Sequence, residues 1–421
     1  MAIDMEEMGK KAKQAARGLV LVGSDQKNGF LVTLADLLRS STPEILTANA
    51  ADIQAGRAGV MSDALVDRLL LNEKRIEGMA QDLLDLAGMP DPVGQVIEEK
   101  KLSSGLHASR VRVPLGVMAV IYEARPNVTI DISALGIKSG NAVILRGGKE
   151  TLQTNNALVN LIHTALQSNQ LDTDVVQFIN DPDRALASIL VKMDNYVDVL
   201  IPRGGNTLQN FCKKEATMPV MTGGIGICHL FVDDSADQSR ALPVIFNAKV
   251  QRPSVCNALD TILVHHRVAS EFLPKVVDTL RPAGVRLKLD DKAQAILGVD
   301  SESGLEAASD GDFDQEWLSL TLGICVVKDL DEAIDFIYKH STFHSDGILT
   351  ENKLNAEHFL KAVDSAAVYV NASTRFTDGA QLGLGGEVAV STQRLHARGP
   401  VGLEALTTYK WVMRGDYTVR A

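Results

Sequence analysis

Cys256 is the side chain of this sequence best placed for nucleophilic chemistry. It lies within 246–265 (FNAKVQRPSVCNALDTILVH), after a helix-like stretch and before a strand-like one, where Pro253 imposes an irregular backbone. Lys249 and Arg252 precede it closely, and a cation near a partly exposed thiol lowers the thiol pKa and favours the nucleophilic thiolate. The same texture also fits an ordinary loop cysteine, so both interpretations stay open from local sequence alone. The other cysteines lie in apolar segments typical of small buried side chains: Cys212, Cys228 and Cys325.

Two glycine-rich turns with basic residues each follow a strand-like run and open a helix. They read LRGGKE (145–150) and IPRGGNT (201–207). Glycine lets a backbone approach a ligand closely, while a helix N-terminus and a cation attract an anion. Two such turns in one sheet favour an anionic cofactor, although no strand is followed by GxGxxG and no GxxxxGK[ST] occurs. An ordinary dinucleotide fold or P-loop is therefore disfavoured.

The elements that must position these residues alternate between short apolar strands and amphipathic helices. The clearest helical pattern covers 151–168, and residues 1 to about 100 also favour helix. Expected strands lie at 117–122, 141–146, 174–179 and 197–202, and again at 259–264, 323–327, 346–349 and 366–370. Such alternation implies parallel sheets covered on both faces, in two α/β domains. Residues 103–113 and the tail after 405 alternate like exposed strands.

Composition excludes several classes of protein. The 421 residues carry 42 Lys and Arg against 53 Asp and Glu, a net charge of −11. Global attraction to nucleic acid or to an anionic membrane is therefore not expected, whereas a local basic pocket for a small anion is compatible with this charge. No apolar run approaches the roughly 18 residues of a membrane span, and the N-terminal segment lacks the apolar core of a secretory signal. Without CxxC or HExxH spacing, we expect a cytoplasmic protein with neither disulfides nor a bound metal.

Seven long segments together resemble one family. They are VPLGVMAVIYEARPNVTID (113–131), NAVILRGGKET (141–151), DVLIPRGGNTL (198–208), GGIGICHLFVDD (223–234), NAKVQRPSVCNALDT (247–261), SAAVYVNASTRF (365–376) and EVAVSTQRLHARGPVGLEALTTYKW (387–411). The chain resembles the gamma-glutamyl phosphate reductase family of the aldehyde dehydrogenase superfamily over essentially its whole length. The resemblance implies an aldehyde dehydrogenase-like α/β fold: two parallel-sheet Rossmann-like domains and a small oligomerisation β element.

The resemblance also implies a reaction. γ-Glutamyl phosphate would be reduced by NADPH to glutamate 5-semialdehyde with release of phosphate, the second step of proline biosynthesis. Cys256 corresponds to the nucleophile that forms a thioester. Asn127 resembles the oxyanion-hole asparagine, which would act together with the backbone N–H of Cys256; losing one such donor typically costs about 10²–10³ in rate.

Cofactor contacts follow from the resemblance too. The first turn would hold the adenosine ribose and the 2′-phosphate of NADPH through Arg146, Gly147, Gly148 and Lys149. Which of its two cations meets the phosphate stays open. The second turn would lie near the pyrophosphate or nicotinamide through Arg203, Gly204 and Gly205, and Glu387 would position the nicotinamide ribose.

The substrate implied by the family is anionic at both ends. Lys249 and Arg252 are the expected ligands of the departing phosphate, and Arg125 and Arg375 those of the glutamyl α-carboxylate. A structural salt bridge is the alternative for each arginine. Oxidising members of the superfamily carry a glutamate before the paired glycines, where this chain has Met221. A methionine cannot activate water, so the thioester is expected to escape hydrolysis.

The expected domains are 1–225 for NADPH, with a return of the chain at 376–404, and 226–375 for the nucleophile. The strands 103–113 and 405–421 would pair between subunits in a homodimer or a tetramer. Association with glutamate 5-kinase is a reasonable expectation because the acyl phosphate is labile. Two other functions remain as alternatives: an aldehyde-oxidising hydrolytic dehydrogenase and a catalytically silent scaffold.

Overall fold

The computed structural model of the chain describes residues 3–58, 61 and 63–420. They form two compact units, each described here by itself. Unit 1 comprises Met1–Gly223, Gly383–Ala389 and Pro400–Ala421, and unit 2 comprises Gly224–Leu382 and Val390–Gly399. Unit 2 therefore extends beyond residue 375, where the sequence analysis ends the domain of the nucleophile.

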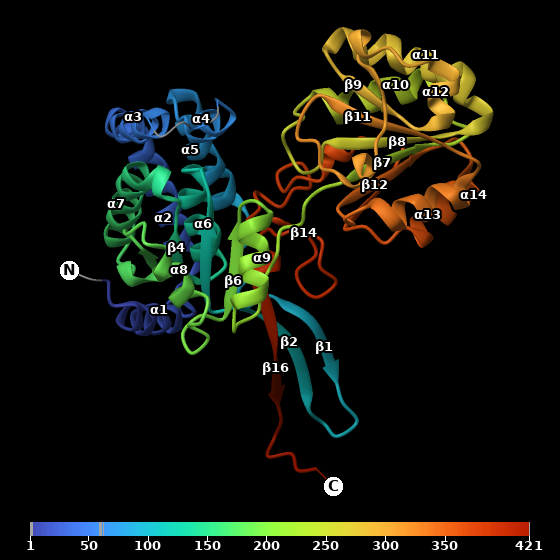
Figure 1. The fold of residues 1–421 in the computed structure, drawn as a ribbon. Coiled ribbons are helices and arrows are strands. Elements are labelled where there is room, and N and C mark those ends of the chain that lie inside the picture. The colour runs from blue at the N-terminus through green and yellow to red at the C-terminus, as the bar shows by residue number, and fades with distance from the viewer. Residues whose placement is uncertain (1–2, 59–60, 62, 421) are drawn as a thin grey trace. The chain divides into compact units, whose positions relative to one another are not determined.

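Unit 1 is built on a four-stranded parallel sheet in the order β5-β4-β3-β6 (Figure 1). Its strands are β3 (Val117–Tyr122), β4 (Ala142–Arg146), β5 (Val176–Phe178) and β6 (Val199–Arg203). Every residue of β3 is buried, as expected for a continuous apolar run in a sheet covered on both faces. The helices of this unit are α1 (Met5–Leu19), α2 (Ser24–Ser40), α3 (Thr42–Ala58), α4 (Asp63–Leu69), α5 (Glu73–Gly88), α6 (Asn127–Lys138), α7 (Leu152–Ser168), α8 (Arg184–Leu190) and α9 (Asn206–Glu215).

The register of this sheet brings the expected functional turns to one edge. Ile121 of β3 pairs with Arg146 of β4, and Tyr122 pairs with Arg203 of β6. Because the three strands are parallel, both glycine-rich turns and the start of α6 follow the same carboxyl edge.

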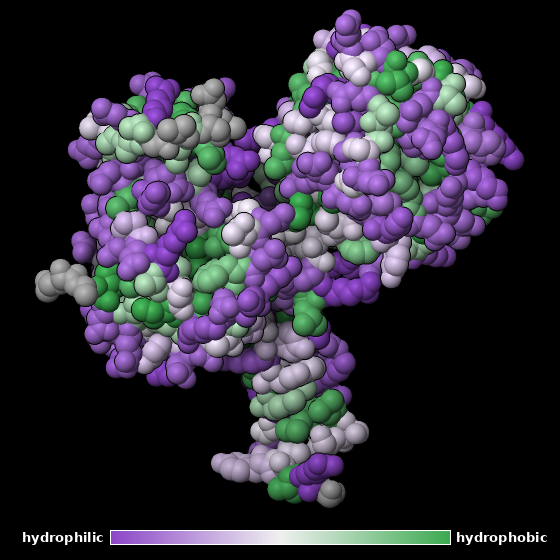
Figure 2. Space-filling model, viewed as in Figure 1, coloured by the Kyte–Doolittle hydropathy of each residue, from purple (hydrophilic) through white to green (hydrophobic). Residues whose placement is uncertain are grey.

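A three-stranded antiparallel sheet also belongs to unit 1, with strands β1 (Val96–Lys101), β2 (His107–Pro114) and β16 (Thr407–Arg414) in the order β1-β2-β16. It extends away from the four-stranded sheet (Figure 1). Tyr409, Trp411 and Met413 are each about half exposed, and apolar and polar residues mix on the visible face of these strands (Figure 2). The sequence analysis expected strands near β2 and β16 but missed β1.

Unit 2 contains a seven-stranded parallel sheet in the order β10-β9-β11-β8-β7-β12-β13. The strands are β7 (Cys228–Val232), β8 (Leu259–His265), β9 (Arg286–Leu289), β10 (Leu305–Ala307), β11 (Thr321–Val327), β12 (Ser345–Leu349) and β13 (Ala367–Val370). The helices are α10 (Gln238–Val250), α11 (His266–Leu280), α12 (Asp291–Leu297), α13 (Leu330–His340) and α14 (Lys353–Ala362). Two short strands, β14 (Val390–Ser391) and β15 (Gly399–Pro400), pair with each other.

Two apolar cores hold the helices of unit 2 on opposite faces of its sheet. Leu230 and Val232 of β7 pack with α10–α12, whereas Phe231 between them packs with α13 and α14 (Figure 1). This alternation is what the period of a β-strand requires. The covered parallel sheets confirm the predicted α/β class. None of the described helices is long and apolar enough to cross a membrane.

Candidate active site

Asn127 is the first residue of α6, which begins after the short loop that follows the carboxyl end of β3. Its side-chain Nδ2 donates to Oδ2 of Asp131, one helical turn later, at 2.8 Å. Burial raises the pKa of Asp131 to about 7; Asn127 as donor and Arg203 lower it, and Asp82 raises it further. The carboxyl therefore fixes one N–H of the Asn127 amide. The sequence analysis missed Asp131, although a polar pair at i, i+4 is a signal that helical spacing offers.

The first glycine-rich turn leaves little space beside Gly147, whereas the space beside Gly148 is filled by the movable end of the Glu150 side chain. A Cβ at Gly147 would lie 2.2 Å from Nδ2 of Asn155, and one at Gly148 would lie 2.0 Å from Oε1 of Glu150. Arg146 is half-buried and donates to the backbone oxygen of Asp183 at 3.1 Å, and burial lowers its pKa. Lys149 begins the short 3₁₀ helix that leads into α7.

The second turn already receives an anionic group. The backbone N–H of Gly205, the residue that caps α9, donates to Oε2 of Glu123 at 3.1 Å. A Cβ at Gly204 would lie 2.4 Å from the same oxygen. A carboxylate on a helix N-terminus is the interaction that the helix dipole favours, so this turn has the chemistry of an anion site.

Arg125 and Glu387 also belong to unit 1. Arg125 is half-buried on the loop between β3 and α6, after Ala124, whose φ is +48°. Glu387 is half-buried in the segment Gly383–Ala389, which is tied to the final part of the chain by a bond from Val388 N to Val401 O at 2.9 Å.

Cys256 lies in unit 2 on the loop between α10 and β8, and its side chain is partly exposed. The backbone of Gly226 passes this loop so closely that a Cβ there would lie 1.5 Å from the carbonyl oxygen of Cys256 and 3.0 Å from its Cα. Cys228 donates its thiol to the same carbonyl oxygen at 3.3 Å. The loop that carries Cys256 therefore packs directly on the segment 226–228. Gly226 was not singled out from the sequence.

Asn257, the next residue, fastens this loop to the segment after β13. Its Nδ2 donates to the backbone oxygens of Thr377 at 2.9 Å and Arg375 at 3.3 Å, and Thr374 Oγ1 donates to the backbone oxygen of Asn257 at 2.7 Å. Arg375 Nη1 in turn donates to Oδ1 of Asn257. Burial and the repulsion of Arg252 lower the pKa of Arg375, whereas attraction to Asp378 and, after it, to Cys256 raises it. The structure therefore brings Cys256, Arg252 and Arg375 into one electrostatic neighbourhood.

Lys249 corrects one expectation. Its side chain is fully buried, and Nζ donates to the backbone oxygen of Leu259 at 2.7 Å and lies 3.8 Å from Oδ1 of Asp260. Burial lowers the pKa of Lys249 and raises that of Asp260 to about 6. Asp260 also accepts the backbone N–H of Cys228. Lys249 thus supports the start of β8 from inside the unit, and the expectation that it meets the phosphate of the substrate is wrong.

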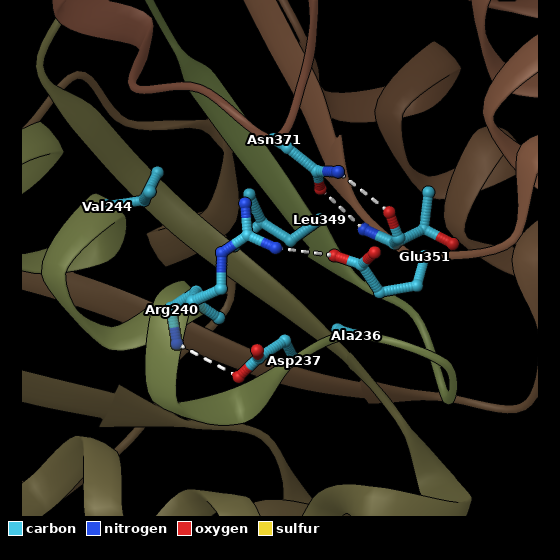
Figure 3. A pocket seen from close by; sticks show the side chains of 9 residues that line it. Ala236, Asp237, Arg240, Val244, Leu349, Glu351 and Asn371 are labelled. Carbon is cyan, nitrogen blue, oxygen red and sulfur yellow. Dashed lines mark hydrogen bonds and ion pairs between the residues drawn. The ribbon is translucent and has the colours of Figure 1, made fainter.

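A separate pocket lies at the carboxyl edge of the unit 2 sheet (Figure 3). Its polar side chains are paired among themselves: Arg240 with Glu351 at 3.2 Å, and Asn371 with both backbone groups of Thr350 at 2.8 Å. Cys256 precedes β8 and so lies at the opposite, amino edge. Cys256 is therefore not among the residues that line this pocket. Among the described residues, no group of three or more His, Cys, Asp or Glu could hold a metal.

The geometry of both units agrees with the comparisons to known proteins. Residues 2–297 match the aldehyde dehydrogenase family. The chain belongs to this family. It is 54% identical over 418 residues to the gamma-glutamyl phosphate reductase of Psychromonas ingrahamii, covering 99% of this chain and 100% of the relative. The protein of the same name from Photobacterium profundum has the same identity and coverage.

Solved structures agree. The crystal structure of gamma-glutamyl phosphate reductase from Thermotoga maritima superposes with a TM-score of 0.95 at 45% identity, covering 100% of both chains. An acetylating aldehyde dehydrogenase from Geobacillus thermoglucosidasius shares the fold, with a TM-score of 0.69 at 15% identity over 99% of this chain and 97% of the other. The family resemblance and the predicted fold are thus confirmed.

Proposed function

We propose that the chain reduces γ-glutamyl phosphate to glutamate 5-semialdehyde with NADPH and releases phosphate, as the second step of proline biosynthesis. One observation carries the proposal: more than half of the residues are identical, along the full length, to those of proteins named gamma-glutamyl phosphate reductase. The neighbourhood of Cys256 supports it, because Arg252 and Arg375 suit an anionic acyl substrate.

The residues of unit 1 fit a dinucleotide phosphate. Gly205 offers its backbone N–H to an anion and now holds the Glu123 carboxylate, a chemical stand-in for a phosphate oxygen. Arg146 and Lys149 are the two cations for a 2′-phosphate, and Glu387 is the proposed ligand of the nicotinamide ribose. When bound, the nicotinamide supplies the hydride. We accordingly take unit 1 as the cofactor domain and unit 2 as the domain of the nucleophile.

The chain's own residues perform the acyl transfer. The Cys256 thiolate attacks the acyl carbon, a C–S bond forms, and the bond to the phosphate oxygen breaks with its electron pair on phosphate. Arg252 stabilises the departing phosphate, and Arg375 and Arg125 receive the α-carboxylate. Asn127 and the backbone N–H of Cys256 donate to the oxyanion.

Met221 stands where a hydrolytic relative has the base that would activate water against the thioester. It is 3% exposed, and its thioether has no basic group that could activate water. The thioester therefore survives until reduction. After reduction, the sulfur–carbon bond breaks, which releases the aldehyde and restores the Cys256 thiolate.

The reaction run in reverse tests the function. Purified protein receives glutamate 5-semialdehyde, NADP⁺ and inorganic phosphate, and NADPH formation is followed by absorbance beside the variant Cys256→Ala. Phosphate-dependent NADPH formation that vanishes in the variant supports the proposal. Equal NADP⁺ reduction without phosphate would mean that water resolves the thioester, as in a hydrolytic dehydrogenase, and would refute the assignment of Met221. No turnover under any condition would favour a silent scaffold.

The sequence analysis expected the strand 103–113 to pair between subunits, but its part in β2 is the central strand of the antiparallel sheet and is already paired with β1 and β16. We further propose that β1 and β16, the two edge strands of this sheet, pair with a second copy in a homodimer or a tetramer. The half-exposed Tyr409, Trp411 and Met413 support this assignment. Sedimentation velocity measures the assembly, and the same measurement with added glutamate 5-kinase tests whether the labile acyl phosphate is passed within a complex. None of the four cysteines, all of which lie in the described part of the chain, is in a disulfide, and reduced cysteines suit a reducing cytoplasm.

A further inference from the structure

Asn257 holds Arg375, an arginine that interacts electrostatically with Cys256, while carrying no charge itself. Its side chain is 4% exposed, it follows Cys256 directly in the chain, and its Oδ1 accepts from Nη1 of Arg375. The Nε of Arg375 donates to Oε1 of Gln251, on the other side of the nucleophile loop, at 3.1 Å. The guanidinium is thus held between two neutral amide oxygens.

The backbone around Arg375 is held by the same amide. Nδ2 of Asn257 donates to the carbonyl oxygens of residues 375 and 377, so both ends of the Arg375 turn are tied to the residue after the nucleophile. A primary amide offers an acceptor and two donors in one plane, and all three are used here. Neither an aspartate nor a leucine of similar size could make these three bonds.

We propose that Asn257 is a positioning residue whose neutral amide fixes the Arg375 guanidinium beside the Cys256 thiol without cancelling its positive charge, thereby favouring the thiolate and an anionic acyl substrate. The inference deepens the proposed function, and it rests on that function only for the identity of the acyl substrate.

The choice of an amide has a physical reason. A carboxylate at 257 would bind Arg375 more strongly, but the pair would be neutral overall and its field at Cys256 would largely vanish. An amide adds no negative charge to that of Asp378, whose attraction already raises the pKa of Arg375, so more of the positive charge of the guanidinium stays available. Arg252 adds a second positive charge nearby, as its repulsion of Arg375 indicates.

Two alkylating probes of the same size measure this field. Iodoacetate is anionic and iodoacetamide is neutral, so the ratio of their rates at Cys256 reports the local charge. Peptide mass spectrometry assigns the modified cysteine, since Cys212 and Cys228 are buried and burial raises the pKa of Cys325. We expect Asn257→Ala and Arg375→Met each to lower the ratio by about fivefold, the order for one partly screened unit charge. Asn257→Asp lowers it at least as far.

A double variant separates positioning from general damage. If Asn257 acts through Arg375, then Asn257→Ala has no further effect on the ratio in the Arg375→Met background. Thr374→Val is the matched control, because it removes a bond of the same clamp, to the backbone of Asn257, without touching the guanidinium. It is expected to lower the melting temperature and to leave the ratio unchanged. If Asn257→Ala does not fold, the ratio of the two alkylation rates is measured in Asn257→Ser and Asn257→Asp instead.

Three results would overturn the proposal: a wild-type ratio in Asn257→Ala, an equal loss in Thr374→Val, or single effects that multiply in the double variant. None of these measurements uses the substrate or NADPH. A failure of the reverse reaction with normal probe ratios would therefore count against the proposed substrate and not against the role of Asn257.

Discussion

Replacing Gly226 with alanine tests whether the nucleophile must be seated on the segment that precedes β7. The added Cβ would lie 1.5 Å from the carbonyl oxygen and 2.5 Å from the carbonyl carbon of Cys256, and ordinary contact begins at 3.4 Å. Both obstructing atoms are backbone, so no side-chain rotation relieves the overlap. One of the two segments must therefore move by roughly 2 Å.

The expected loss follows from that displacement. A misplacement of about 1 Å at a reacting group can cost about 10² in rate, so we expect Gly226→Ala to lower kcat/KM of the reverse reaction by at least about 100-fold. Overpacking of this kind costs about 1–3 kcal/mol of stability, which leaves the protein folded. NADPH binding, a property proposed for unit 1, is expected to stay unchanged by fluorescence titration.

Gly78→Ala is the matched control, because nothing lies within 4 Å of its Cβ position in α5. Its activity is expected to equal the wild type, with a slight gain in stability from the better helix former. If Gly226→Ala keeps activity within about threefold of the wild type, the close approach to Cys256 does not govern the position of the nucleophile.

Three further substitutions test other parts of the structure. Asp131→Asn is expected to lower kcat about tenfold, because it changes the group that accepts the hydrogen bond from the Asn127 amide and so fixes that amide. The pKa of Asp131 is about 7 in the folded protein and near 3.9 in the unfolded chain, so the wild type loses stability relative to this variant as pH rises from 4 to 7, by at most about 4 kcal/mol. Urea unfolding of both proteins at pH 5 and pH 8 measures this loss. An equal difference in stability at the two pH values would contradict the prediction. Lys249→Met leaves the buried Asp260 carboxyl without the positive charge of Lys249 and is expected to lower the unfolding free energy by about 3–5 kcal/mol. A raised KM for phosphate with unchanged stability would instead indicate that Lys249 is a phosphate ligand. Trp411→Glu is expected to shift the sedimentation coefficient towards the monomer, and an unchanged coefficient would remove β16 from the interface.

The regular helices and strands were predictable because the spacing of apolar residues and the position of turn residues indicate them directly. The predicted strand 117–122 is β3 residue for residue, and the predicted helix 151–168 is α7 within one residue. Short strands were missed: β9, β10 and β1 have few residues or a polar, exposed face, so hydrophobic patterning carries little signal for them.

The error at Lys249 has a different origin. Nearness to Cys256 in sequence suggested a ligand, but α10 places Lys249 on the same stripe as Ala241 and Ile245, eight and four residues earlier, and this stripe faces the core. Helical spacing was the better guide there. The clamp through Asn257 could not be read from the sequence at all, since it joins residues about 120 positions apart through side-chain geometry.

The pairing of β2 with β16 has a consequence for how the protein is made. Residues 107–114 of β2 pair with residues 407–414 of β16, which are synthesised almost 300 residues later. Unit 1 therefore stays incomplete until residues 407–414 have left the ribosome, whereas most of unit 2 is one continuous stretch. Loops of this length are slow to close. The edge of β2 that faces β16 therefore stays unpaired until β16 has been synthesised and has docked. Nascent chains would be most exposed to aggregation or to chaperone capture at β1 and β2, and a truncation that removes β16 would prolong that exposure indefinitely.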